Sequence, residues 1–398
     1  MRRYLAHQMK SILKLERIVL GGLCLLLCAH ASAETLIYSL SYAETPTSLR
    51  ARFPNGAIGA SINKRLAMLR KYRKTEIHSV SLDGKSSLLF SDEGMNFEIS
   101  PQGTMLGAGK ALMTGVEREW RTSPTTGAYA SSPALYEISL DGSKQIRRLI
   151  ETMPNQGPVL LNPTGTKVVS EAFVDGRYMV SIYDTATWKV LDSWDLGKLI
   201  RAHCPDCLPV SYGWMVEGDR LFFNLDFGDE DGIESETHDV PGTYIASRDG
   251  SKYVRMPIEN GELQLAGYTR QKDIIPYLIG QLPGGENVFH DYALKNGAVR
   301  KMPIELQSFL VIAHPNGEDK KQFSLGASRI SSYYLSPTGK YVAYIEERQV
   351  PKYRTERHVW GKDLRSGNEV ELFVVPPVHP SSSTETNLTF TVLGWVQD

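Results

Sequence analysis

The sequence has 398 residues and is almost neutral, with 44 Lys and Arg residues against 45 Asp and Glu residues. A balanced charge excludes the strongly basic surface with which proteins neutralise the phosphates of nucleic acid, so we expect no nucleic-acid partner. The 34 glycines, 21 prolines and 19 tyrosines are typical of many short strands joined by turns.

The first 33 residues have the three parts of a secretory signal peptide. A basic start precedes an apolar run at residues 18–29, and Ala31, Ser32 and Ala33 then form the small-residue site that a signal peptidase cleaves. The apolar run is shorter than the roughly 20 residues that a membrane-spanning helix needs, so we expect no transmembrane span after cleavage. The sequence therefore predicts an exported protein of the periplasm, with secretion to the cell exterior as the alternative.

Residues 34–398 contain two recurring turn patterns, and the first is a Pro-x-Gly turn between two apolar segments. Pro presets one backbone angle of such a turn and Gly tolerates the strained position, so the chain reverses direction there. The pattern occurs at residues 54–56, 101–103, 163–165 and 337–339, with weaker copies at 217–219 and 270–273.

The second pattern is a strand of alternating apolar and polar residues that ends in an Asp-Gly-like turn. Asp-Gly and Asn-Gly between such strands predict β-hairpins. The pattern occurs at residues 77–84, 135–142, 180–185, 244–250, 288–297 and 359–367.

The two patterns alternate six times along the chain, and each pair marks the four antiparallel strands of one β-propeller blade. We therefore predict an all-β fold, with a single β-propeller domain at residues 34–398 and six four-stranded blades. A β-sandwich has no reason to repeat the same two turns in order. Residues 309–317 leave a seventh blade as the alternative, because they form another apolar segment followed by Pro-Asn-Gly.

The last strand of the chain is expected to close the ring. Residues 393–398 (LGWVQD) repeat the pattern of residues 212–217 (YGWMVE), which the order of turns assigns to the first strand of a blade. We expect the C-terminal strand to complete a blade with an N-terminal strand at residues 36–42. Closure of this kind protects strand edges that would otherwise stay unpaired.

The segments LSPTGKYVAY at residues 335–344 and ISPQG at 99–103 resemble the repeat element of TolB-like propellers. The strand LYEISLDG at 135–142 fits the second half of that repeat. The resemblance covers essentially all of residues 34–398 and implies the propeller fold. TolB itself carries a separate mixed α/β domain before its propeller. Similar repeats form the lid of prolyl-oligopeptidase-type enzymes, but this sequence has no G-x-S-x-G nucleophile motif.

Loop length gives the main functional expectation. Connections between the second and third strands of a blade, and between successive blades, open at one end of the ring, and several are long. Long loops on a rigid scaffold usually carry binding sites, so we expect this end to bind an envelope protein or an envelope glycan. The candidate contacts are the basic and aromatic residues of three loops: Arg70, Lys71, Tyr72, Arg73 and Lys74; Arg118, Trp120 and Arg121; Lys352, Tyr353 and Arg354.

The loop of the fourth blade is acidic instead. Asp226, Asp229 and Asp231 carry carboxylate oxygens of the kind that coordinate calcium. The stretch departs from an EF-hand loop, because Phe227 and His238 stand where that motif has its first and last ligands. We expect no resident cofactor, with calcium at the three aspartates as the alternative.

Two cysteines, Cys204 and Cys207, remain in the chain after the predicted cleavage. An isolated pair in an oxidising compartment usually forms a disulfide, and we predict one here. A redox-active pair would need a helix N-terminus that lowers the pKa of the thiol, whereas this segment is expected to be a loop between blades. A zinc site that includes His203 lacks an evident fourth ligand.

Sequence motifs for catalysis are scarce. His78, His290 and His358 lie in or beside the expected third strands of their blades, where packing accounts for them. The favoured function is a monomeric, non-catalytic binding scaffold. The alternative is a hydrolase or lyase that acts on a polysaccharide or a peptide in the central axial pocket, and a redox helper that uses the two cysteines is a third possibility.

Overall fold

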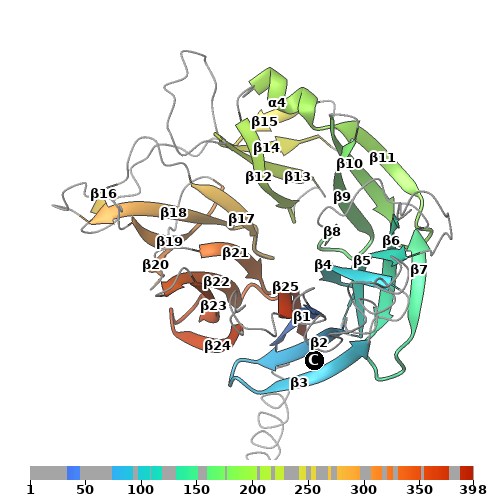
Figure 1. Ribbon diagram of the computed structural model, residues 1–398. Coiled ribbons are helices and arrows are strands. Elements are labelled where there is room, and N and C mark those ends of the chain that lie inside the picture. The colour runs from blue at the N-terminus through green and yellow to red at the C-terminus, as the bar shows by residue number, and fades with distance from the viewer. Residues whose placement is uncertain are drawn as a thin grey trace, which may run out of the picture.

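The computed structural model describes residues 34–44, 74–92, 97–107, 109–118, 131–150, 159–174, 177–203, 207–216, 220–227, 242–247, 252–256, 268–269, 276–295, 306–315, 321–325, 330–350, 354–375 and 386–397. These residues form strands and one short helix, α4 (Gly197–His203). The sheets are arranged around a central axis, so the molecule is a ring (Figure 1). The signal peptide predicted for residues 1–33 lies outside the described residues.

Six antiparallel sheets form the blades of the ring, which confirms the predicted six-bladed, four-stranded β-propeller. From the axis outward, blades 1 to 3 are β25 (Thr386–Gln397), β1 (Glu34–Glu44), β2 (Lys74–Ser81) and β3 (Ser86–Asp92); β4 (Phe97–Met105), β5 (Lys110–Arg118), β6 (Ser131–Ser139) and β7 (Ile146–Ile150); and β8 (Val159–Leu161), β9 (Lys167–Val174), β10 (Arg177–Asp184) and β11 (Val190–Asp195).

Blades 4 to 6 complete the ring (Figure 1). They are β12 (Cys207–Trp214), β13 (Leu221–Phe227), β14 (Gly242–Ala246) and β15 (Tyr253–Arg255); β17 (Tyr277–Gln281), β18 (Asn287–Lys295), β19 (Leu306–Ala313) and β20 (Lys321–Ser324); and β21 (Ile330–Leu335), β22 (Tyr341–Val350), β23 (Arg354–Asp363) and β24 (Glu369–Val375). A further two-residue strand, β16 (Tyr268–Thr269), pairs with β18 in blade 5.

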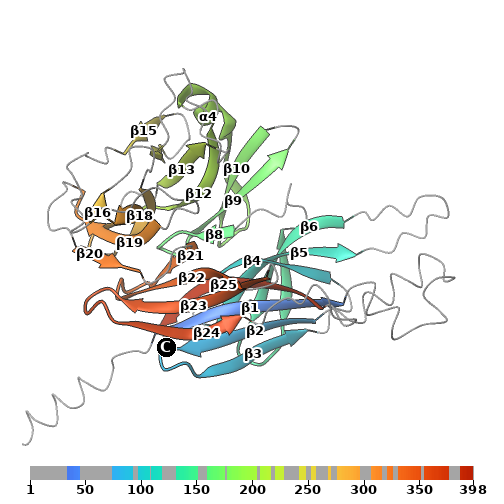
Figure 2. The same ribbon diagram turned by 60° about the vertical axis from the view of Figure 1, so that its left-hand side comes forward.

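The ring is closed by the two ends of the chain, as predicted. β25 supplies the inner strand of blade 1 and pairs antiparallel with β1, from Glu34 opposite Gln397 to Glu44 opposite Thr386. Figure 2 shows β25 and β1 side by side in the same sheet. The pairing extends over the whole of β1, so β25 covers the inner edge of β1.

Blade 5 differs from the prediction by one strand. β18 was expected to be a third strand that ends at Asn296-Gly297, but it is the second strand, and β19 follows it in the sheet. The turn that precedes β18 is at residues 282–286, where the backbone N–H of Leu282 bonds to the carbonyl of Glu286 at 2.8 Å. Residues 283–285 have the Pro-x-Gly pattern, which the sequence interpretation placed at 270–273 instead. Residues 309–317 therefore belong to blade 5, and the seven-blade alternative is wrong.

A second expected turn, at residues 101–103, is a bulge inside β4. The register of β4 against β5 jumps from Ile99 opposite Gly115 to Gly103 opposite Met113. A Cβ atom on Gly103 would lie 2.4 Å from the carbonyl oxygen of Leu112, so a side chain there is excluded by the neighbouring backbone. The chain reverses direction only after Met105.

Apolar side chains fill the interfaces between blades. In the described part of the chain each of the six interfaces has its own cluster of buried hydrophobic residues. The cluster between blades 4 and 5 is the smallest, with Met215, Phe222 and Leu278 as its buried members. The helix found in the described ranges is not long enough to cross a bilayer.

Candidate functional site

Connections of different length leave the two ends of the ring. Because neighbouring strands are antiparallel, the turns from first to second and from third to fourth strand lie at one end, as at residues 162–166 and 82–85. The connections from second to third strand lie at the other end, and they include residues 45–73, 119–130, 228–241 and 296–305. We call this the long-connection end.

Blade 6 does not follow the expected loop pattern. The strands β22 and β23 are joined by residues 351–353 alone, with Val350 opposite Arg354, so the predicted long loop is a hairpin. Arg348 lies on β22, where its Nε donates to Glu346 Oε1 at 2.8 Å, and its guanidinium lies 5.8 Å from the ring of Trp360. Arg357 Nε on β23 lies 3.6 Å from Glu347 Oε1 on β22, and this cross-strand ion pair, with the contact between Arg348 and Trp360, stabilises the longer strands.

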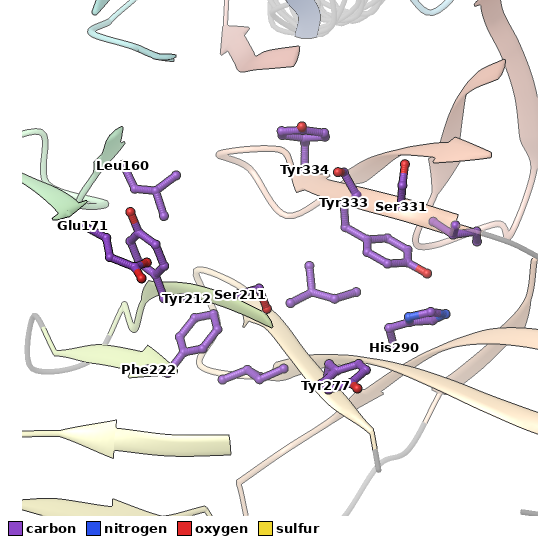
Figure 3. Close-up of a pocket in the computed structure, with 14 residues that line it drawn as sticks. Leu160, Glu171, Ser211, Tyr212, Phe222, Tyr277, His290, Ser331, Tyr333 and Tyr334 are labelled. Atoms are coloured by element: carbon purple, nitrogen blue, oxygen red, sulfur yellow. The ribbon is translucent and has the colours of Figure 1, made fainter. Parts of the chain in front are cut away.

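An axial cavity of about 610 Å³ lies among the inner strands of blades 3 to 6. Its volume is in the range of small-ligand sites. Its walls are mainly aromatic and aliphatic, as Figure 3 shows, and the lining residues are Leu160, Glu171, Ser211, Tyr212, Phe222, Tyr277, Leu278, Ile279, His290, Ile330, Ser331, Ser332, Tyr333 and Tyr334.

The cavity spans the middle of the inner strands. Each inner strand runs from the long-connection end toward the short-turn end. The lining residues of β17 are its first three, and those of β21 are its first five. On blade 4, Ser211 and Tyr212 lie in the second half of β12, and Phe222 is the second residue of β13, next to the short-turn end. The cavity therefore does not belong to one end of the ring alone.

A buried amide holds the wall of the cavity in place where the apolar packing is thinnest. Asn224 on β13 is fully buried, and its Nδ2 donates to Ser211 Oγ and to the carbonyl of Leu278, both at 2.8 Å. Its Oδ1 accepts from Thr243 Oγ1 at 2.6 Å and from the N–H of Leu278 at 3.3 Å. All four hydrogen-bonding positions of the amide are used, so Asn224 fixes β17 of blade 5 against blade 4.

Glu171 on β9 is the acidic residue among the described residues that line the cavity, and no Lys or Arg is among them. Burial raises the pKa of its carboxyl to about 6. Tyr212 on β12 lies beside it on the same wall (Figure 3). Burial, with the nearby charge of Glu171 as a smaller cause, raises the pKa of Tyr212 well above 10, so this phenol stays protonated.

The opposite wall carries His290 and Tyr333 (Figure 3). Their ring centroids are 4.7 Å apart and the rings are tilted by 50°. Burial lowers the pKa of His290 to about 3, because a charged imidazole loses its hydration there, so this side chain is neutral at physiological pH. Packing of His290 was predicted correctly, but on a third strand, and its place on β18 brings it to the axial cavity.

The predicted contact residues are only partly within the described chain. Lys74 is the first residue of β2, opposite Tyr42, Arg118 is the last of β5, opposite Ser131, and Arg354 is the first of β23. Each therefore stands where a strand meets the long-connection end. The others lie outside the described residues: Arg70, Lys71, Tyr72, Arg73, Trp120, Arg121, Lys352 and Tyr353.

The proposed calcium ligands are also divided. Asp226 lies on β13, with its backbone opposite Leu208, while Asp229 and Asp231 lie outside the described residues. Within the described ranges, no three His, Cys, Asp or Glu residues are grouped so that they could hold a metal ion.

The two cysteines follow a helix rather than lying in a plain loop. α4 ends at His203, directly before Cys204, which lies outside the described residues, and Cys207 begins β12. The predicted disulfide and the alternative redox-active pair both involve Cys204, so both stay predictions.

Comparisons with known proteins give similarities to solved structures alone, at low identity. The chain matches no protein-family model, and no match is found among curated proteins. Among solved structures it is similar to TolB from Acinetobacter baumannii (13% identity, TM-score 0.45), covering 89% of this chain and 66% of that chain. It is also similar to a putative TolB from Agrobacterium tumefaciens (12%, 0.45; 90% and 98%) and to a chain of a nidogen/laminin complex (10%, 0.42; 90% and 99%).

These similarities concern the fold. The chain spans just under two thirds of the Acinetobacter TolB. The identities are 10–13% and the TM-scores 0.42–0.45, so these similarities say nothing about a shared ligand or activity. The six-bladed architecture itself rests on the observed strand pairing.

The lining of the axial cavity, apart from His290, was not singled out from the sequence. Glu171, Tyr212, Tyr333 and Tyr334 belong to three different blades and show no common motif. One available signal was the strand segment that contains Glu171, since an unpaired acidic residue among apolar neighbours (VVSEAF) is unusual in a blade strand.

Proposed function

We propose that this chain is an exported, non-catalytic scaffold that holds a protein partner at the long-connection end of its propeller. The observation that carries this proposal is the grouping of the long connections at one end of the ring. The long second-to-third-strand connections lie there, whereas the other end has short turns. Broad surfaces built from loops on a rigid scaffold are typical of protein recognition.

The charges of the connecting segments support a protein partner. Residues 70–74 read RKYRK, while residues 226–239 carry seven acidic residues, DFGDEDGIESETHD. Opposite charges on one face favour a partner with a complementary mixed-charge surface, since such patterns guide association and orientation. Export is supported by the signal-peptide pattern of residues 1–33.

A crosslinking pull-down from a native envelope extract, read by mass spectrometry, tests the proposal. The wild-type chain is compared with a variant in which Arg70, Lys71, Arg73 and Lys74 are changed to Ala. The matched control removes four exposed lysines from the short-turn end: Lys85, Lys189, Lys252 and Lys321.

We expect one enriched protein that is lost in the first variant and kept in the control. Equal loss in both variants would show that net charge, not the long-connection end, controls binding. Enrichment of no protein, with retention on a glycan array instead, would replace the protein partner by an envelope glycan and so contradict the proposal.

A further inference from the structure

The axial cavity combines one carboxylate with aromatic walls. Among the described residues that line it, Glu171 is the acidic one and none is a Lys or an Arg. The rings of Tyr212, Phe222 and Tyr277 and those of Tyr333 and Tyr334 surround the same space. From this geometry we propose that the cavity binds an organic cation, an ammonium or guanidinium group, with Glu171 as its counter-ion and the tyrosine rings as its walls.

The charge balance of the cavity favours a cation over a neutral ligand. A neutral molecule that displaced water from Glu171 would leave a desolvated carboxylate without a counter-charge, which is costly. A cation pairs with that carboxylate and also gains from the electron-rich faces of aromatic rings within about 6 Å. Cavities that bind ammonium groups commonly combine these two features.

A metal ion fits the cavity less well than an organic cation. Calcium takes about six to eight oxygen ligands and is held mostly by several carboxylates. The described lining residues offer one carboxylate, and their other polar groups are three serines, four tyrosines and a histidine. The cavity of about 610 Å³ is also much larger than a bare ion needs, whereas it matches a ligand with an apolar stem.

Protonation of Glu171 should control binding. Burial raises the pKa of its carboxyl to about 6, so the charge that attracts the cation is lost as the pH falls through that value. Two titratable groups lie near Glu171. One is Tyr212 on β12, and the other is Tyr178 on β10, two residues from Val180, which is opposite Glu171 in the sheet. Across the cavity are Tyr277, Tyr333, Tyr334 and His290, whose lowered pKa of about 3 keeps it neutral. Phenols ordinarily titrate near 10, so Glu171 is the lining residue that changes charge between about pH 5 and 8.

Isothermal titration calorimetry with matched probes tests the proposal. Nα-acetyl-arginine methylamide and Nα-acetyl-lysine methylamide represent a basic side chain of a partner protein, and spermidine and cadaverine represent free amines. The neutral counterparts are the capped citrulline and norleucine. At pH 7.5 we expect the better-binding capped cation to bind at least about tenfold more tightly than its neutral counterpart, and we expect the free amines to bind more tightly than either neutral probe if they are the ligand class. Affinity should fall by about tenfold per pH unit below pH 6.

Two variants locate the site. Glu171→Gln keeps the size of the side chain and should abolish the preference for cations. Glu369→Gln is the control, because Glu369 is another half-buried carboxyl whose pKa burial raises, to about 7, but it lies on the outer strand β24. The control should bind as the wild type does. If Glu171→Gln does not fold, the pH profile of the wild-type chain and the cation-to-neutral ratio decide the question.

The outcomes are distinct. Tighter binding of capped amino acids would indicate a partner side chain as the source of the cation, and tighter binding of free amines a small metabolite. Equal binding of neutral and cationic probes, unchanged cation binding in Glu171→Gln, or no binding at millimolar concentration would overturn the proposal. None of these results depends on residues 70–74, so failure of the partner proposal would be recognised separately.

Discussion

The indole Nε1 of Trp395 donates a hydrogen bond of 2.8 Å to the backbone carbonyl of Tyr334. Trp395 is on β25 and Tyr334 is on β21, so this bond joins blade 1 to blade 6 at the point where the ring closes. Trp214 forms the same kind of bond, at 3.1 Å, from β12 to the carbonyl of Leu160 on β8. The two tryptophans thus join the inner strands of adjacent blades through a side-chain-to-backbone bond.

Replacement of Trp395 by Phe should keep most of the apolar packing and remove the bond. We expect the free energy of unfolding to fall by about 1–2 kcal/mol, because the carbonyl of Tyr334 loses its partner. Trp395→Ala should cost about 3–5 kcal/mol, since the buried ring is lost as well. Urea unfolding followed by far-ultraviolet circular dichroism measures both. Equal costs for the two variants would contradict a separate contribution from the hydrogen bond.

Replacement of Asn224 by Ala should destabilise the contact between blades 4 and 5. The N–H and carbonyl of Leu278 would lose their buried partner, which costs about 2–4 kcal/mol for the pair. Asn368→Ala is the control, because Asn368 is exposed in a turn and should change stability by less than about 0.5 kcal/mol. Thermal and urea unfolding check both values, and a cost for Asn224→Ala as small as that of the control would show that water replaces the amide.

The burial of neutral His290 should make stability depend on pH. Its pKa is lowered from 6.5 to about 3, so the unfolded chain takes up the proton first as the pH falls. The buried neutral imidazole therefore contributes fully to the free energy of unfolding above about pH 6.5. Below that pH its contribution declines by up to about 1.4 kcal/mol per pH unit. The difference in unfolding free energy between wild type and His290→Gln should narrow in the same way between pH 7.5 and 4.5. A difference that stays constant over this range would contradict the burial of a neutral side chain.

The disulfide predicted between Cys204 and Cys207 should be structural. We expect no thiol in the mature chain to react with iodoacetamide before reduction. A closed loop this short limits the unfolded chain only modestly, so reduction or Cys207→Ser should lower stability by about 2 kcal/mol. Rapid alkylation of one cysteine at pH 6 after mild reduction would instead indicate a thiol with a lowered pKa and a redox role.

Calcium is expected to have no effect on stability. Addition of EDTA should change the melting temperature of the purified chain by less than about 1 °C. A ligand that binds only the folded state raises its stability, so removal of a bound calcium ion would lower the melting temperature. A calcium-dependent rise that disappears in the triple variant Asp226→Asn, Asp229→Asn and Asp231→Asn would establish the alternative site.

The sequence predicted the features of the fold that depend on local chemistry. The turns at residues 163–165 and 337–339 are where they were expected, because Pro and Gly act on the backbone within a few residues. The repeated Gly-Trp motif also identified β25 as an inner strand, and its pairing with β1 confirms that interpretation. In blade 5 the interpretation used the weak copy at residues 270–273 in place of the Pro-x-Gly pattern at 283–285, so it assigned the order of strands wrongly.

The axial cavity could not be predicted in the same way. Glu171 and His290 meet across it only because separate blades place them there, and neither has a neighbour in the sequence that indicates such a role. Gly103 is a similar case. A Cβ atom at this position would clash with the carbonyl oxygen of Leu112 on the adjacent strand, so only glycine fits. The sequence of residues 101–103 does not reveal that neighbour.

The pairing of β1 with β25 also affects how the chain matures during synthesis. Translation proceeds from the N-terminus, so β1, β2 and β3 are made first, and their sheet waits with its innermost edge open until the final twelve-residue strand is complete. A product truncated by a premature stop would keep that edge exposed and would be prone to aggregation and proteolysis. Only a chain that includes β25 can therefore close the ring.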